Sequence, residues 1–291
     1  MSEGVAQDPA QDCDSACSSC AADCSSRTEA AGSAAVSMKA PVNAQTRIKH
    51  VIAIVSGKGG VGKSLVTSLV AAELKRRGHS VGILDADITG PSIPKAFGVS
   101  GKLRANVEGI LPSASTGGIQ VVSTNLVLSE DTAPVLWRGT IISGMVKQFY
   151  SEVIWGDVDY LLIDMPPGTG DVPLTVYQSL PIDGVVIVTA PQDLVSMIVG
   201  KAINMAAAMK VEVLGIVENM AFFECPDCGS RHDIFGTSRI DELAASYDID
   251  LVARIPISPG FAHAMDSGTA EQLETPTLTP FVDALITKVG D

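Results

Sequence analysis

Short apolar runs alternate with longer segments of helical periodicity, and this alternation constrains the fold more than any other feature. The runs are at residues 51–55, 81–84, 160–163, 184–188, 213–217 and 251–255. Runs this short and this continuously apolar are typical of strands buried on both faces. The segments that separate them, long enough for crossover helices, are at 63–77, 141–155, 194–209, 238–247 and 276–289. The alternation predicts an α/β fold with a doubly wound, mostly parallel sheet.

Domain organisation follows from where this alternation begins. Residues 1–45 are rich in Ala, Ser, Asp and Gly and have neither helical nor strand periodicity. A segment that can bury so little apolar surface does not fold alone. We therefore expect a flexible, Cys-rich arm at 1–45 and a single domain at 46–291. Within the domain, residues 106–128 carry several Gly and Ser and are expected to form an inserted hairpin or loop region.

Charge and hydropathy exclude several kinds of partner. The formal net charge is −13, and no cluster of Lys and Arg reverses that balance locally. Such a surface repels phosphate backbones and anionic lipid. No apolar run approaches the roughly 20 residues that span a bilayer, and the N-terminus lacks a basic region followed by an apolar core. We therefore expect a cytoplasmic protein that binds neither nucleic acid nor membrane.

A glycine-rich loop follows the first apolar run and precedes a helical pattern. It reads Gly57-Lys58-Gly59-Gly60-Val61-Gly62-Lys63-Ser64. In such a Walker A loop, backbone N–H groups curl around phosphate oxygens, the second lysine binds the β and γ phosphates, and the serine hydroxyl holds Mg²⁺. We assign these roles to the backbone of residues 57–62, to Lys63 and to Ser64. A tight turn alone would explain the glycines, but not two lysines and a serine at these offsets.

Lys58 makes the match more specific, because an ordinary Walker A needs no lysine after its first glycine. The loop resembles the deviant Walker A of the superfamily that includes MinD, ParA, the nitrogenase iron protein and the Mrp/ApbC proteins. In that superfamily the extra lysine reaches the nucleotide of the partner subunit. The resemblance implies an ATP-bound homodimer in which Lys58 acts like an arginine finger on the transferred phosphoryl group.

Carboxylates follow two of the apolar runs. Asp85 and Asp87 end the run at 81–84, and open α/β sheets bind ligands at the carboxyl ends of such strands. By resemblance, Asp87 is the switch I aspartate that positions or deprotonates the attacking water, and Asp85 lies nearer the Mg²⁺ shell. A helix cap or turn is the structural alternative for Asp85. Asp164 has the position of a Walker B aspartate that holds Mg²⁺ through water.

The residues after Asp164 resemble a switch II segment. They read Pro166-Pro167-Gly168-Thr169-Gly170-Asp171. Two glycines allow this segment to change conformation when the γ-phosphate leaves, and Asp171 is a possible contact. Farther along, Asn219 follows the run at 213–217 and resembles the adenine-contacting Asn of the family, since an amide offers both a donor and an acceptor. As a structural alternative, Asn at a strand end is a common turn residue.

The Cys225-Pro226-Asp227-Cys228 motif separates the possible relatives, because it resembles the Mrp/ApbC signature and not MinD or ParA. One CxxC supplies two thiolates, whereas a [4Fe-4S] cluster or a structural zinc ion usually takes four. A two-fold axis near residue 226 would bring two such pairs together around one bridging [4Fe-4S] cluster. Zinc held in the same way, or a redox CxxC, is compatible with the spacing.

Four further cysteines lie in the arm, at Cys13, Cys17, Cys20 and Cys24. Their spacing approaches that of a bacterial ferredoxin run without matching it. It also departs from the wider spacing of the N-terminal cysteines in some eukaryotic cytosolic scaffold relatives. A second cluster, zinc, or a transient relay is compatible with this pattern.

These features predict an ATPase of the Mrp/ApbC type that uses MgATP and acts as an iron-sulfur cluster scaffold or carrier. We expect slow hydrolysis, and a [4Fe-4S] cluster that is received from cluster donors and passed to apo iron-sulfur proteins. The alternatives are a MinD- or ParA-like positioning ATPase and an ATP-gated electron-transfer protein resembling the nitrogenase iron protein. The C-terminus, residues 276–291, has one lysine against two aspartates, which argues against a membrane-binding helix of the MinD kind.

Overall fold

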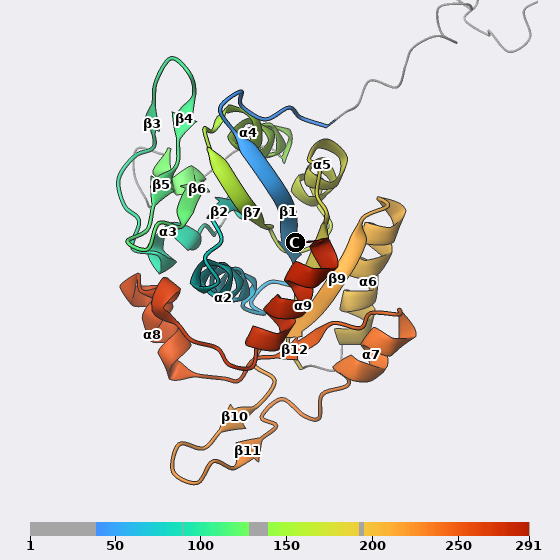
Figure 1. Ribbon diagram of the computed structural model, residues 1–291. Coiled ribbons are helices and arrows are strands. Elements are labelled where there is room, and N and C mark those ends of the chain that lie inside the picture. The colour runs from blue at the N-terminus through green and yellow to red at the C-terminus, as the bar shows by residue number, and fades with distance from the viewer. Residues whose placement is uncertain (1–38, 89, 128–138, 192–194, 291) are drawn as a thin grey trace, which may run out of the picture. The chain divides into compact units, whose positions relative to one another are not determined.

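The computed structural model describes residues 39–88, 90–127, 139–191 and 195–290 (Figure 1). Residues from Lys39 onward form one compact unit, which therefore starts somewhat earlier in the chain than residue 46. The four cysteines expected to form an arm site lie outside the described residues.

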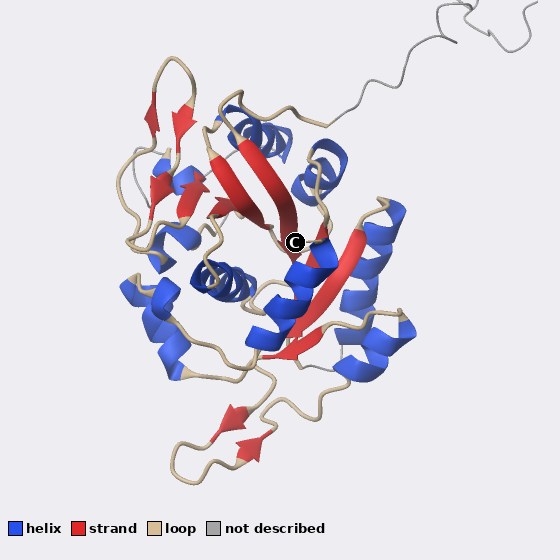
Figure 2. Cartoon of the chain, in the orientation of Figure 1, coloured by secondary structure: helices blue, strands red, loops and turns tan. Residues whose placement is uncertain are grey.

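An eight-stranded sheet forms the centre of this unit, in the order β12-β9-β8-β1-β7-β2-β6-β5. Figure 2 shows strands of this sheet in red with helices around them in blue. All neighbours pair in parallel except β5, which runs antiparallel to β6. The strands are β1 Arg47–Val55, β2 Val81–Asp85, β5 Ser113–Ala114, β6 Gln120–Ser123, β7 Asp157–Asp164, β8 Gly184–Thr189, β9 Glu212–Glu218 and β12 Val252–Arg254. Every apolar run of the sequence contributes a strand, and the expected doubly wound parallel sheet is confirmed.

Helices cover both faces of the sheet. Side chains of a strand alternate between the two faces, so each strand packs against helices on both sides. Val51, Ala53 and Val55 pack in one buried cluster with α4, α5, α6 and α7. Ile52 and Ile54 pack in the other with α2, α3 and α9. The helices are α2 Lys63–Arg76, α3 Ile93–Ala96, α4 Gly139–Glu152, α5 Asp171–Ser179, α6 Val195–Ala208, α7 Ile240–Ser246, α8 Pro259–Ser267 and α9 Thr279–Val289, with 3-10 turns η1 Thr124–Leu126 and η2 Ala270–Gln272.

Two small antiparallel ladders stand outside the main sheet. One joins β3 Arg104–Ala105 to β4 Ile110–Leu111, and the other joins β10 Phe223–Glu224 to β11 Arg231–His232. The segment expected to be a hairpin or loop region, residues 106–128, also supplies β6, which pairs in parallel with β2 inside the main sheet. No helix among the described residues has the length and apolarity to cross a membrane.

The strand register gathers the acidic positions at one edge of the sheet. Asp85 of β2 and Asp164 of β7 are direct neighbours in the ladder, and Asp164 also pairs with Ile54 near the end of β1. The loop after β1 begins at the same edge. The fold therefore brings residues from separate parts of the sequence to the carboxyl ends of three adjacent strands, where open α/β sheets bind ligands.

Candidate functional site

The glycine-rich loop connects β1 to α2 and lines a cavity of about 310 Å³. The cavity walls come from the loop itself and from three other segments: Asp87 after β2, Pro167 after β7 and Met265 of α8. Because α2 begins at Lys63, its N-terminus, with its unpaired backbone N–H groups, opens onto this space. A concavity of this kind at a helix N-terminus favours an anionic ligand such as a phosphate group.

Close packing explains two of the loop glycines. A Cβ on Gly57 would lie 2.3 Å from Cγ2 of Ile198 in α6. A Cβ on Gly62 would lie 2.1 Å from Nδ2 of Asn219, and the φ of Gly62 is +82°. The loop therefore reaches α6 on one side and the end of β9 on the other, and no larger residue fits at either position without displacing a neighbour.

Asp164 is the centre of a buried polar cluster. Its carboxylate is fully buried and accepts hydrogen bonds from Ser64 Oγ at 2.6 Å and Thr67 Oγ1 at 2.7 Å. Lys63, only 6% exposed, places its Nζ 2.8 Å from Asp164 and 3.7 Å from Asp87. The cluster joins the start of α2 to the ends of two strands, and it puts the predicted Walker A and Walker B residues in direct contact.

Asp85 lies beside this cluster and forms no ion pair with any of the described residues. It accepts hydrogen bonds from Ser123 Oγ at 3.1 Å and from the backbone N–H of Asp87 at 3.2 Å. Burial raises the pKa of Asp85 well above its usual range, the negative charge of Asp164 raises it further, and Lys63 opposes the effect. A bound cation would offset this repulsion. Ser64, Asp85 and Asp164 together form a hydroxyl and carboxylate oxygen set of the type that Mg²⁺ takes.

The switch II segment leads from β7 into α5. The backbone N–H of Gly168 donates to the carbonyl of Ser56 at 2.8 Å, which holds the segment against the start of the phosphate loop. Asp171 is the first residue of α5 and is exposed. This segment therefore links the start of the phosphate loop to α5.

Asn219 comes directly after β9 and is buried. Its Nδ2 donates to the carbonyl of Val61 at 3.0 Å, which fixes the side chain against the phosphate loop. Its Oδ1 is buried and has no hydrogen-bond partner among the described residues. A buried unpaired oxygen is costly, and a donor on a bound base would satisfy it.

The CxxC motif lies in the turn of the β10–β11 hairpin, which Figure 1 shows projecting beyond the sheet. Cys225 donates its N–H to the carbonyl of Ser230 at 2.9 Å, and its own carbonyl accepts from Gly229 at 2.8 Å. Cys225 is half-buried and Cys228 is exposed. No residue from 223 to 239 belongs to either buried apolar cluster, so the hairpin is held mainly at its base.

The environment of Cys228 favours the thiolate. Its sulfur lies 3.2 Å from Ser230 Oγ, so the serine hydroxyl can donate to the thiolate. This contact, the Ser230 backbone and the neighbouring Cys225 lower the pKa of Cys228. Within the described residues, no group of three or more His, Cys, Asp or Glu side chains could hold a metal ion. Cys225 and Cys228 therefore form a two-ligand set in this part of one chain, so a four-thiolate site requires ligands from elsewhere.

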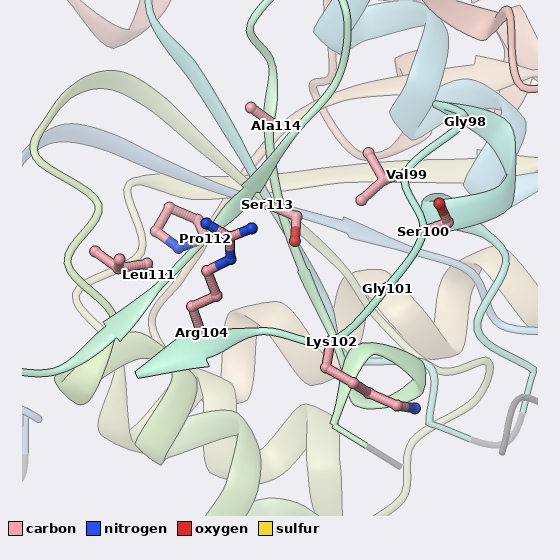
Figure 3. Close-up of a pocket in the computed structure, with 10 residues that line it drawn as sticks. All are labelled: Gly98, Val99, Ser100, Gly101, Lys102, Arg104, Leu111, Pro112, Ser113 and Ala114. Carbon is pink, nitrogen blue, oxygen red and sulfur yellow. The ribbon is translucent and has the colours of Figure 1, made fainter. Parts of the chain in front are cut away.

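A separate cavity of about 650 Å³ lies between the 98–102 loop and the segment from β4 to β5 (Figure 3). In Figure 3 the guanidinium of Arg104 points toward Pro112 and Ser113, whereas Lys102 extends away from them. The cavity includes no residue of the phosphate loop or the CxxC turn. It is therefore distinct from the candidate nucleotide site.

The structure brings the predicted P-loop residues, Asp85, Asp87, Asp164 and Asn219 to one edge of the sheet. Lys58 lies exposed in the loop. Three contributors escaped sequence reasoning: Thr67, Ser123 and Met265. Thr67 could have been found, because it lies one helical turn after Lys63 and therefore on the same face of the helix. Ser123 lies in a strand that was not expected, and Met265 in a helix with no recognisable motif.

Comparisons with known proteins agree with this geometry. Residues 47–289 match a ParA-type family model described as the NUBPL iron-transfer P-loop NTPase. The iron-sulfur cluster carrier protein of Clostridium perfringens is 46% identical over 234 residues, which cover 77% of this chain and 82% of the relative. The protein of the same name from Methanocaldococcus jannaschii is 47% identical over 225 residues, covering 77% and 78%.

Two solved structures have a similar fold. A nucleotide-binding protein from Archaeoglobus fulgidus, solved in complex with ADP and with cobalt, superposes with a TM-score of 0.73 at 47% identity, covering 81% of this chain and 92% of that one. MinD of Pyrococcus furiosus superposes with a TM-score of 0.59 at 20% identity, covering 83% and 99%, and this likeness shows the fold alone. From the family match and the close relatives together, we conclude that the chain belongs to the NUBPL iron-transfer family of P-loop NTPases.

Proposed function

We propose that this protein is an ATP-hydrolysing scaffold or carrier that binds a [4Fe-4S] cluster and transfers it to apo iron-sulfur proteins. The observation that carries the proposal is the presence of two sites on one short stretch of chain. Asn219 contacts the phosphate loop, and Cys225, six residues later, begins the exposed CxxC turn. Relatives named as iron-sulfur cluster carriers, at 46% and 47% identity, support the same function.

The nucleotide chemistry is assigned to the residues around the cavity. Residues 57–62 would hold the phosphates with their backbone N–H groups, and Lys63 would bind the β and γ oxygens. Ser64, Asp85 and Asp164 would hold Mg²⁺, which when bound neutralises charge on the phosphates.

Asp87 would position the attacking water or accept its proton, because its carboxylate lines the cavity near Lys63. Lys58, reaching a partner subunit, would stabilise the charge that develops on the transferred phosphoryl group. Asn219 would contact the adenine through its unpaired Oδ1.

The cluster chemistry requires two copies of the chain. Cys225 and Cys228 supply two thiolates, and a homodimer would supply the four that a [4Fe-4S] cluster takes. The exposed position of the turn supports this arrangement, since a partner copy and a recipient protein can both approach it. The lowered pKa of Cys228 favours the thiolate form that binds metal. The arm, residues 1–45 with Cys13, Cys17, Cys20 and Cys24, is proposed as a possible second metal or cluster site.

The test is anaerobic purification and reconstitution with iron and sulfide. Iron and sulfide per dimer, Mössbauer spectra and transfer to an apo-protein that needs a [4Fe-4S] cluster would be compared for wild type, a Cys225→Ala/Cys228→Ala variant and a variant that lacks residues 1–38. We expect the double substitution to lose a [4Fe-4S] signal that the deletion retains. Wild-type protein that holds only zinc, or no metal, would refute the carrier function and leave only a nucleotide switch.

Two alternatives are separated by further measurements. A positioning ATPase of the MinD or ParA kind would bind vesicles or DNA in the presence of ATP and would hold no cluster. An electron-transfer protein resembling the nitrogenase iron protein would hold a cluster whose reduction potential shifts with ATP. Retention of the cluster in the presence of an electron acceptor, with transfer only to apo-protein, would support the carrier.

A further inference from the structure

A buried carboxylate beside Asn219 has no role in the site described so far. Glu218, the last residue of β9, is 1% exposed, and its Oε2 has no hydrogen-bond partner among the described residues. The nearest cation is Arg254, with Nε 3.7 Å from Oε2. Burial raises the pKa of Glu218, and the nearby Ser238 hydroxyl and the charge of Arg254 oppose this rise. A buried, incompletely paired carboxylate is costly to stability, so its position calls for an explanation other than packing.

Arg254 connects Glu218 to the end of the CxxC hairpin. It is the last residue of β12 and pairs with Glu218 in the strand register. Its Nε donates to Ser238 Oγ at 3.4 Å, and its Nη2 donates to Asp241 Oδ2 at 2.5 Å. Ser238 ends the returning limb of the hairpin, and Asp241 lies in the first turn of α7. One guanidinium therefore contacts the sheet edge, the hairpin limb and the next helix.

The outgoing limb of the hairpin is fixed by backbone hydrogen bonds to the segment that follows β12. Ala221 donates to the carbonyl of Ile255 at 2.9 Å, and Ile257 donates to the carbonyl of Phe222 at 2.7 Å. Phe223 and Ile257 also form a β-bridge. The two limbs thus differ in attachment: the outgoing limb is held by the backbone, and the returning limb by the side chains of Arg254 and Ser238.

The segment that follows β12 leads to the wall of the nucleotide cavity. After Ile257 the chain enters α8, which begins at Pro259 and carries Met265 into the cavity lined by the phosphate loop. Directly after Glu218, at the same end of β9, Asn219 contacts Val61 of that loop. Residues 252–259 therefore touch the hairpin on one side and lead to the cavity on the other.

We propose that Glu218 and Arg254 are positioning residues that couple the nucleotide cavity to the CxxC turn. The pair fixes the returning limb relative to the outgoing limb, so that a displacement of Asn219 or α8 on nucleotide binding changes the placement of Cys225 and Cys228. The role of this coupling in cluster transfer rests on the proposed carrier function. The coupling itself changes the reactivity of the two thiols, and that reactivity can be measured without a cluster.

The experiment measures alkylation of the thiols in the cluster-free full chain under anaerobic conditions. Iodoacetamide labelling is resolved by mass spectrometry, so that Cys225 and Cys228 are followed separately from the four arm cysteines. Rates are compared without nucleotide, with MgADP and with a non-hydrolysable MgATP analogue. In wild type we expect nucleotide to change the rate at one or both thiols by roughly 5-fold or more, the lower range of typical coupling between sites.

Three variants and one control test the role of the pair. Glu218→Gln and Arg254→Gln remove one charge each, and Ser238→Ala removes the hydroxyl with little change in volume. Arg239→Gln is the control, because Arg239 follows Ser238 directly but its guanidinium pairs with Glu242 of α7 on the surface. We expect the three variants to bind the nucleotide, measured by calorimetry, and to lose the nucleotide dependence of alkylation. The control should retain it.

Ser238→Ala protects the test against misfolding of the other two variants, because Ser238 is only half-buried. A folded Ser238→Ala protein with wild-type nucleotide dependence would overturn the proposal, as would wild-type thiols whose alkylation ignores nucleotide. Loss of nucleotide affinity in all three variants would also overturn the proposal, because Glu218 and Arg254 would then act in nucleotide binding and not in coupling. Failure of the carrier function would differ from each of these results: wild type would take up no cluster while its thiols still responded to nucleotide.

Discussion

Gly62 provides a quantitative test of how tightly the phosphate loop packs. Its φ of +82° lies in the left-handed region, where a residue with a Cβ costs about 1–2 kcal/mol. The substitution also makes the unfolded chain less flexible, which offsets about 0.4–1 kcal/mol of that cost. Backbone strain alone therefore predicts that Gly62→Ala lowers the free energy of unfolding by about 1 kcal/mol.

The contact with Asn219 adds to this cost. A Cβ at residue 62 would lie 2.1 Å from Asn219 Nδ2, so the amide must move and lose its hydrogen bond to Val61. A net hydrogen bond of this type contributes about 0.5–1.5 kcal/mol, and burying the unpaired groups costs more. We expect Gly62→Ala to destabilise by about 1–2 kcal/mol beyond the strain, or by about 2–8 °C in Tm for a chain of this size.

Gly78 supplies the matched control. Its φ is +89°, close to that of Gly62, but a Cβ there would meet nothing within 4 Å. Thermal and urea unfolding of Gly62→Ala and Gly78→Ala would isolate the contact with Asn219 as the difference between them. ATP affinity should fall only in Gly62→Ala. Equal destabilisation by the two substitutions, with ATP affinity unchanged in both, would refute the packing argument.

The remaining predictions concern charge and reactivity. Because the folded pKa of Asp85 is raised, wild type binds an extra proton when folded, and its stability should fall as pH rises from the unfolded value of about 4; urea titrations in EDTA should show that Asp85→Asn removes this slope, and an unchanged slope would contradict the assignment. Lys58→Ala should abolish ATP turnover while the chain still folds, since the side chain is exposed and lies outside the core; normal turnover would argue against a catalytic lysine. Ser230→Ala should raise the pKa of Cys228, and a pH profile of alkylation would show slower labelling at neutral pH, with Ser246→Ala as a distant control.

Much of the fold was predictable because parallel strands buried on both faces leave a strong apolar signal. The strand containing Tyr160, for example, combines a run of large apolar residues with burial on both sides. Strand β6 was missed for the opposite reason, since Gln120-Val121-Val122-Ser123 is short and follows a Gly-rich segment. The helix expected to run to Trp155 ends at Glu152. Trp155 is a fully buried core residue just before β7. In the sequence its hydrophobicity looked like a continuation of the apolar face of the helix.

The candidate site was predictable where chemistry is local and was not where contacts are long-range. The phosphate loop and the CxxC turn are each contained within a few residues, so sequence spacing described them. The contact of Ser123 with Asp85 and the approach of Met265 to the cavity depend on how distant elements pack. The connection from Glu218 through Arg254 to Ser238 is of the same kind, since its three residues have no motif in common.

The projecting hairpin has a consequence for how this protein can change over evolutionary time. Residues 223–239 contribute no side chain to the two buried clusters, so the apolar packing of the domain does not depend on them. Mutations in the turn are therefore filtered by metal chemistry and recognition, not by the survival of the fold. A P-loop ATPase with this architecture can acquire, alter or discard such a turn in small steps, and the loop that holds the nucleotide can remain unchanged throughout.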